Sequence, residues 1–226
     1  MEFNELATLR WLHIIAMVYW LGGEWGVFQT SYNVINRALP LDERRRHMET
    51  AYRIDILART GIILLLPLGL HMGHIWGLQP LGGAWLWAMW LLTAAWLALC
   101  WGAFMKRETE AGVRLTKIDE SIRFVLIPLL LLVALSSLLG YGPLSGEPST
   151  RWYAAKMFLY GCTLVIGLKL RFIMREWTTM FRLLAAGPNA EVEATLDRSI
   201  RFGRRIAYLY WVLIGSTAYL GAAKPF

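Results

Sequence analysis

Residues 9–29, LRWLHIIAMVYWLGGEWGVFQ, form an apolar run that contains one histidine, His13, and one carboxylate, Glu24. A helix needs about 20 mainly apolar residues to cross the hydrocarbon core of a bilayer, so this run is long enough to span a membrane. Ionisable side chains inside hydrocarbon are costly and usually serve a function. The run therefore predicts a membrane span and marks both residues as candidates for a site.

The composition of the whole chain agrees with a membrane protein. The chain has 226 residues, of which 57% are hydrophobic and 17% are charged, and its mean hydropathy is +0.43. Soluble domains carry about 25% charged residues. The positive charge lies beside apolar segments, which indicates contact with the lipid bilayer and no nucleic-acid partner. No C-x-x-C-H motif occurs in the sequence, which excludes covalent c-type haem.

Six apolar segments are long enough to cross a membrane, and each should be helical because a span must satisfy its own backbone polar groups. They are residues 8–34, 55–78, 84–104, 122–141, 152–174 and 204–222. We therefore expect an all-α, polytopic membrane helix bundle with six transmembrane helices. The sequence shows neither a repeat nor a second domain, so we treat residues 1–226 as one transmembrane domain. A short cytoplasmic helical segment is expected at about 175–203, interrupted by a turn at 187–189, GPN.

The distribution of positive charge predicts the orientation of the bundle. Arginine and lysine gather in residues 37–53, 105–123 and 169–205. Positively charged segments beside spans stay in the cytoplasm. Both termini should then lie on the periplasmic side of a bacterial inner membrane. Asp55, next to the first basic segment, is expected to be a surface residue at the cytoplasmic interface.

Three of the four histidines are expected at one level of the membrane. His13 lies near the start of the first span, and His71 and His74 lie near the end of the second. Consecutive spans run antiparallel, so these positions share a depth near the outer face. Neutral imidazole is a good metal ligand, and haem b needs no covalent tether. We therefore predict haem b held by His13 and by His71 or His74, although each histidine alone could be a hydrogen-bonded interface residue.

Copper is the alternative metal at this level. The segment HMGH places the thioether of Met72 between His71 and His74, and thioether sulfur suits Cu(I). Consecutive helical residues point about 100° apart, so the three groups do not chelate one ion easily.

Other side chains complete the candidate cofactor site. Trp20 lies on the same helical stripe as His13, and it could equally be a packing residue. Arg10 and Lys156 are expected at the histidine level, where either one could neutralise a haem propionate or hold an anionic substrate. Lys156 could instead extend to the lipid headgroups.

Glu24 and Arg59 are predicted to share a depth below the histidines. Glu24 follows His13 by 11 residues, which returns it to nearly the same helix face about 16 Å deeper. Arg59 precedes His71 by 12 residues, or about 18 Å. The two side chains can therefore form a buried ion pair that joins the first two spans, or they can belong to a proton path.

The stretch LRWLHIIAMVYWLGG resembles the first-helix signature of a broad group of bacterial membrane proteins. The group includes the CopD copper-resistance family, the HemJ-type protoporphyrinogen oxidases and the membrane part of the cytochrome-linked urate oxidase. The pattern H-x-x-A-x-x-x-W-x-G-G carries the resemblance, through His13, Ala16, Trp20, Gly22 and Gly23. In this group the first-helix histidine is associated with b-type haem, so the resemblance implies that role for His13.

These features together favour a membrane cytochrome of b type. It would transfer electrons between the quinone pool and a periplasmic cytochrome or a membrane complex, alone or as a homo-oligomer. A HemJ-like, haem-dependent oxidase and a CopD-like copper transport or binding protein are the alternatives. The sequence identifies no catalytic residues for an oxidoreductase.

Overall fold

The computed structural model describes residues 4–107, 109–144 and 147–225, and all regular structure within these ranges is helical. The elements are α1 (Glu5–Val34), α2 (Leu41–Ile75), α3 (Ala84–Met105), α4 (Glu110–Leu138), the short 3-10 helix η1 (Pro148–Thr150), α5 (Arg151–Ala185) and α6 (Ala190–Ala223). Six helices among the described residues are long and apolar enough to cross a membrane. The prediction of an all-α bundle with six spans is confirmed, whereas the side on which the termini lie stays a prediction.

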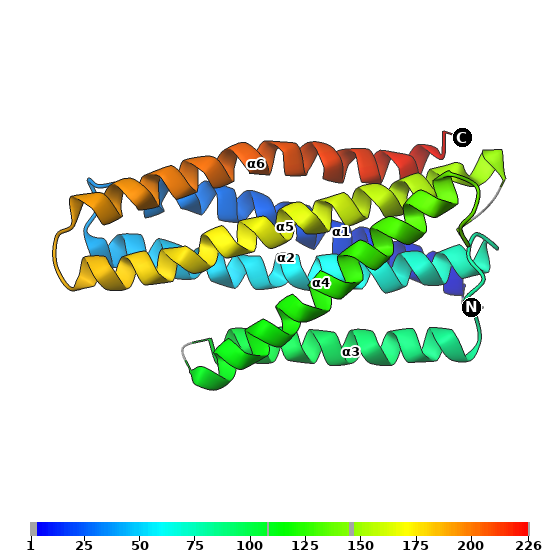
Figure 1. The fold of residues 1–226 in the computed structure, drawn as a ribbon, viewed down its shortest axis with the longest axis horizontal. Coiled ribbons are helices and arrows are strands. Elements are labelled where there is room, and N and C mark those ends of the chain that lie inside the picture. The colour runs from blue at the N-terminus through cyan, green and yellow to red at the C-terminus, as the bar shows by residue number, and fades with distance from the viewer. Residues whose placement is uncertain (1–3, 108, 145–146, 226) are drawn as a thin grey trace.

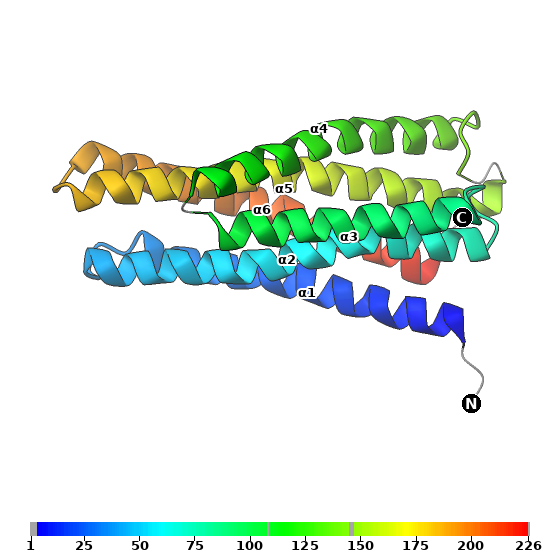
Figure 2. The same cartoon turned by 90° about the horizontal axis from the view of Figure 1, so that it is seen from below.

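Two antiparallel helix pairs form the body of the bundle. α1 packs along α2, and α5 packs along α6, as Figure 1 shows for the second pair. α3 lies at one edge, and α4 crosses obliquely from α3 to α5. Figure 2 shows α1 diverging from its neighbours toward its N-terminal end. The bundle therefore has an interior between α1, α2, α5 and α6, with α3 and α4 outside it.

The two ends of the bundle differ in chemistry. The chain ends lie together with the α2–α3 and α4–α5 connections, and we call this the terminal end (Figure 1). The α1–α2, α3–α4 and α5–α6 connections lie toward the other end, which we call the basic end because the arginine-rich segments surround it. An even number of spans predicts this arrangement, in which both chain ends lie at the same end of the bundle.

The basic segments belong to the long helices. α2 begins at Leu41, well before its apolar part, and α4 begins after Thr109, whose hydroxyl accepts a hydrogen bond from the Gly112 N–H. The 175–203 segment consists of the paired ends of α5 and α6. The predicted turn at 187–189 separates them, and the Asn189 side chain accepts from the first N–H groups of α6.

A second apolar core extends the bundle beyond the expected membrane level at the basic end. Val34, Met48, Trp177 and Leu196 are among its buried members. Arg44 crosses this end: its Nε donates to the Val34 carbonyl at 2.9 Å, and its guanidinium forms a two-point pair with Glu193 at 2.7 and 2.9 Å. The first and last helices are therefore joined through α2 outside the expected bilayer.

Small residues allow α1 and α2 to approach closely. A Cβ at Gly61 would stand 2.9 Å from the backbone nitrogen of Trp20 and would also contact the carbonyl oxygen of Ala16. Close backbone approach through small residues is typical of helix packing in membranes. This crossing places the side chains of α1 in the interior and thereby positions the site.

Candidate functional site

His13 points into the interior between α1, α2 and α5. Its Cε1 lies 3.7 Å from the position that a Cβ would take at Gly69 on α2. On α5, the Tyr153 hydroxyl donates to the Gly69 carbonyl at 3.2 Å. Glycine at position 69 thus brings the imidazole against the backbone of α2 beside the Tyr153 ring.

The imidazole of His13 has no hydrogen-bond partner among the described residues. Its Nδ1 is sealed from solvent. A neutral imidazole carries one donor and one acceptor, and leaving such a buried group unpaired costs about 1–3 kcal/mol. The residue therefore has the ligand chemistry that the sequence predicted and no structural hydrogen bond that explains its burial.

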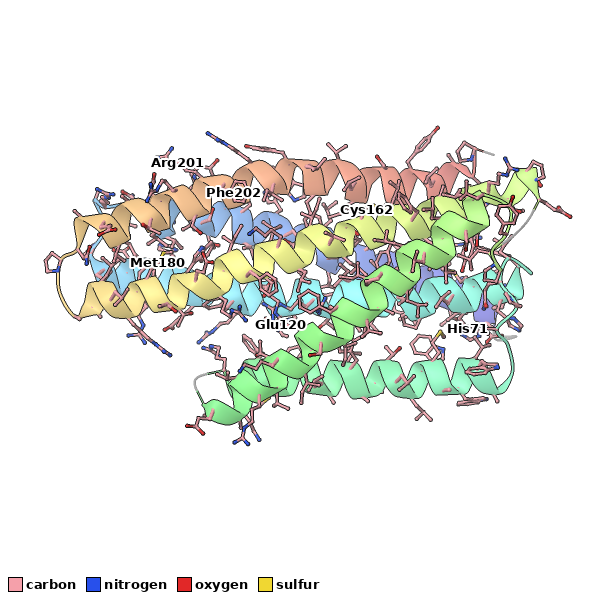
Figure 3. The ribbon with its side chains drawn as sticks, in the orientation of Figure 1. His71, Glu120, Cys162, Met180, Arg201 and Phe202 are labelled. Atoms are coloured by element: carbon pink, nitrogen blue, oxygen red, sulfur yellow. The ribbon has the colours of Figure 1, made fainter. Side chains whose placement is uncertain are left out.

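His71 lies elsewhere, between α2 and α3, as Figure 3 shows. Its Nδ1 accepts from the Trp90 indole N–H at 3.2 Å, and its Nε2 lies 3.2 Å from a carboxylate oxygen of Glu5. His71 follows Gly69 by two residues, which is about 200° around the helix axis. It therefore faces away from His13, and both of its nitrogens are engaged.

His74 lies at the α2–α3 connection. Its ring packs on Gly82 in the α2–α3 connection. Met72, between the two histidines, is buried in the main core. Within the described ranges, no group of three or more His, Cys, Asp and Glu side chains is placed to hold a metal. The structure thus puts the three histidines near one end of the bundle without bringing them to one point.

A lysine accompanies His13 in the interior. The Lys156 ammonium packs against Gly221 on α6, near enough to His13 for their charges to interact. Lys156 has no ion pair within the described part of the chain. We call His13, Gly69, Tyr153 and Lys156 the terminal site, and its charge suits an anionic group.

Arg10 is not part of the terminal site. It is exposed on α1, and no ion pair or hydrogen bond of its side chain occurs among the residues that the structure describes. The prediction that Arg10 shares the cofactor site with Lys156 gains no support, because it lies outside the interior.

Trp20 belongs to a layer of aromatic rings below the terminal site. Its indole N–H donates to the Tyr210 hydroxyl at 3.0 Å, and its ring meets Tyr160 edge-on at 6.1 Å between centroids. All three side chains are buried. We call Trp20, Tyr160 and Tyr210 the aromatic layer, and it separates His13 from Glu24 along α1.

Arg59 pairs with Asp55 on its own helix, and not with Glu24. Residues four apart on a helix lie side by side, so Asp55 reaches the guanidinium without spanning the gap between helices. Asp55 is buried, which makes the expectation of a surface residue wrong. Within the described ranges, Glu24 has neither a hydrogen bond nor an ion pair, although it lies within electrostatic range of Asp55 and Arg59.

Sequence reasoning missed a second charge cluster where α4 crosses α5. The fully buried Asp119 accepts from the Trp96 indole N–H at 2.7 Å and pairs with Arg123 and Arg171. Glu120, labelled in Figure 3, pairs with Arg175 at 2.9 Å. The sequence did contain a sign of this cluster: charged residues spaced four apart on two helices, 119/123 and 171/175, at the same expected depth. We had interpreted both pairs only as part of the positive charge that flanks membrane spans.

Comparison with known proteins finds no match among protein-family models, curated protein sequences or solved structures. The resemblance of the first helix to the CopD and HemJ group therefore stays an expectation, and the terminal site has to be interpreted from its own geometry.

Proposed function

We propose that this protein is a membrane-embedded, b-type haem redox protein in which His13 would hold the haem iron. The observation that carries the proposal is the half-buried His13 imidazole, whose buried Nδ1 has no hydrogen-bond partner among the described residues and whose ring lies against Gly69. An imidazole is the commonest protein ligand of haem iron. Iron coordination would remove the cost of the unpaired nitrogen.

The other residues of the terminal site fit the same group. Lys156 supplies a positive charge without an acidic partner in the described chain, which suits the carboxylate of a haem propionate. Gly69 and Gly73 let the side chains of His13 and Tyr153 lie close to the backbone of α2. Haem, when bound, supplies one-electron transfer, while these residues bind and orient it and exclude water.

The functional role we assign is electron transfer between the quinone pool and a partner at the terminal end. The six apolar helices support a multi-pass membrane location. The basic end faces the cytoplasm in this proposal, according to the positive-inside rule, and the membrane is the bacterial inner membrane.

A haem-dependent oxidase is the second candidate, and one observation favours it. His71 contacts Trp90 on α3 and His74 packs on Gly82 in the α2–α3 connection, whereas His13 lies against Gly69. A haem with one protein ligand keeps a coordination position for a small molecule, whereas two histidines favour electron transfer alone. Copper bound by His71, Met72 and His74 has no such supporting geometry.

The experiment is an absorbance measurement on protein purified in detergent from haem-producing cells. We expect a reduced spectrum typical of haem b, and we expect His13→Ala to abolish it. His47→Ala is the matched control, because His47 lies at the basic end, far along α2 from the terminal site, and this variant should keep the full haem content.

The outcomes separate the candidates. Carbon monoxide binding to the reduced protein would favour the oxidase, and its absence, with loss of haem in His71→Ala or His74→Ala, would favour two histidine ligands. A folded His13→Ala protein that retains its haem would overturn the proposal. A colourless wild type that binds stoichiometric copper would replace it with the copper protein.

A further inference from the structure

A cavity lies between α1, α2, α5 and α6, on the basic side of the aromatic layer. Its volume is about 60 Å³, and Glu24, Asp55, Arg171 and Arg204 line it together with apolar side chains. A water molecule needs about 10–15 Å³ of such space and two to four polar partners, so the cavity can hold a few waters. We call this mainly apolar cavity, with its few charged side chains, the chamber.

Glu24 is the group in this chamber whose charge has no direct partner within the described ranges. The titratable and charged groups around it come from three neighbouring helices: Asp55 and Arg59 on α2, Arg171 on α5, and Arg204 and Tyr210 on α6. Asp55 and Arg59 neutralise each other. Arg171 is held by Asp119 on α4. Neither pair leaves a cation free for Glu24.

Arg204 is the remaining cation of the chamber. Its Nε donates to the Ser31 hydroxyl at 2.9 Å, its guanidinium stacks 3.7 Å above the Tyr32 ring, and its buried Nη2 has no partner in the described chain. These contacts join α6 to α1 at the side of the cavity. Because Arg204 is partly exposed, it marks the side from which water can reach Glu24.

The aromatic layer closes the chamber on its other side. Trp20 and Tyr210 are each only 1% exposed, and the hydrogen bond between them joins α1 to α6 across the interior. Water that reaches Glu24 therefore has no described polar route to the terminal site.

We propose that Glu24 is a proton-exchange site that communicates with the basic end of the bundle only. Its carboxylate takes up a proton from a hydronium ion in the chamber, so one O–H bond forms as one in the hydronium breaks, and it returns the proton to water by the same route. The ionised form lies within electrostatic range of Arg59, and the neutral form suits the apolar span. The site does not require haem, so a loss of haem and a loss of proton exchange are separate results.

Labelling with dicyclohexylcarbodiimide tests the proposal, because this apolar reagent modifies protonated carboxyl groups within membranes. Wild-type protein in sealed vesicles is labelled with the pH changed on one side at a time, and the modified residues are identified by peptide mass spectrometry. A thiol-specific, impermeant reagent on Arg46→Cys identifies the vesicles that expose the basic end. Glu24→Gln is the variant that removes the site, and Asp197→Asn, on the surface of α6, is the control.

When the pH on the basic side is raised above the titration point of Glu24, we expect the rate of Glu24 labelling to fall about tenfold for each pH unit. Changing the pH of the terminal side should leave it constant. Trp20→Ala should open the aromatic layer and make the labelling depend on both sides. Absence of label on Glu24 at every pH would overturn the proposal, and so would labelling of wild type that follows the terminal side.

Discussion

The indole nitrogen of Trp20 donates a 3.0 Å hydrogen bond to the hydroxyl of Tyr210, although the two residues lie 190 positions apart in the chain. This bond joins α1 to α6, whose backbones come close at few points. It also divides the interior into the terminal site and the chamber of Glu24. The predictions below begin with this bond.

Tyr210→Phe should destabilise the protein by about 1–3 kcal/mol, because it leaves the buried Trp20 N–H without an acceptor. Thermal unfolding in detergent, followed by tryptophan fluorescence, measures the effect. Tyr219→Phe on the same helix is the control, since that ring is 62% exposed. Equal stability of the two variants would show that the hydrogen bond contributes nothing.

Gly61→Ala should destabilise the α1–α2 pair by about 1–3 kcal/mol, the usual cost of overpacking. The new methyl group would meet the Ala16 carbonyl oxygen and the Trp20 backbone nitrogen, and backbone atoms cannot move aside easily. Gly22→Ala is a sharp control, because nothing lies within 4 Å of its Cβ position. Denaturation of both variants in mixed detergent compares them, and the same shift in both would contradict the packing described.

Asp119→Ala should be among the most damaging single changes, with a loss of about 3–5 kcal/mol, because it leaves buried cations unpaired. Arg123, Arg171 and the Trp96 indole N–H would all lose an acceptor. Asp197→Ala, which breaks only an exposed pair with Arg201, should change stability by less than about 1 kcal/mol. The yield of folded protein and its thermal midpoint test this contrast.

Stability should fall with acidification through the Arg44–Glu193 pair. Hydrogen bonds from the Arg44 guanidinium lower the pKa of Glu193 below its ordinary value of 4.5. The folded state therefore gains stability from this carboxylate above about pH 4.5, and loses it as the pH falls through the lower, folded-state pKa. Thermal midpoints of wild type and Glu193→Gln should converge in acid. Glu191→Gln, two residues earlier, should keep the wild-type pH dependence.

Under the proposed haem function, Lys156→Gln should lower the midpoint potential of the haem, because removing a nearby positive charge stabilises the oxidised iron relative to the reduced iron. A redox titration followed by absorbance measures the shift. Lys169→Gln is the control, since Lys169 is exposed on the same helix, nearer the basic end. An unchanged potential in Lys156→Gln would place Lys156 outside the cofactor site.

The position of these residues along the bundle was predictable. Each span satisfies its own backbone, so hydropathy along the chain locates it without knowledge of its neighbours. Antiparallel connection then places His13, His71 and His74 near one end, where the structure has them. The turn at 187–189 was equally local, because it depends on glycine, proline and asparagine in sequence.

Partners could not be predicted in the same way. We predicted an ion pair between Arg59 and Glu24 because the two residues share a depth. In the structure Arg59 pairs with Asp55, which lies one turn away on the same helix. Asp119 meets Arg171 from 52 positions away, because α4 crosses α5 at that level. Depth defines a layer of possible partners, and only the packing of helices selects among them.

The sequence by itself determined the number of spans, the approximate level of each ionisable side chain and the concentration of positive charge at one end. The tertiary structure decided the direction of each side chain around its helix: His13 toward α2 and α5, and His71 toward α3. The physical reason is that height along a helix follows from residue number, whereas the neighbour on each face depends on how all the helices pack.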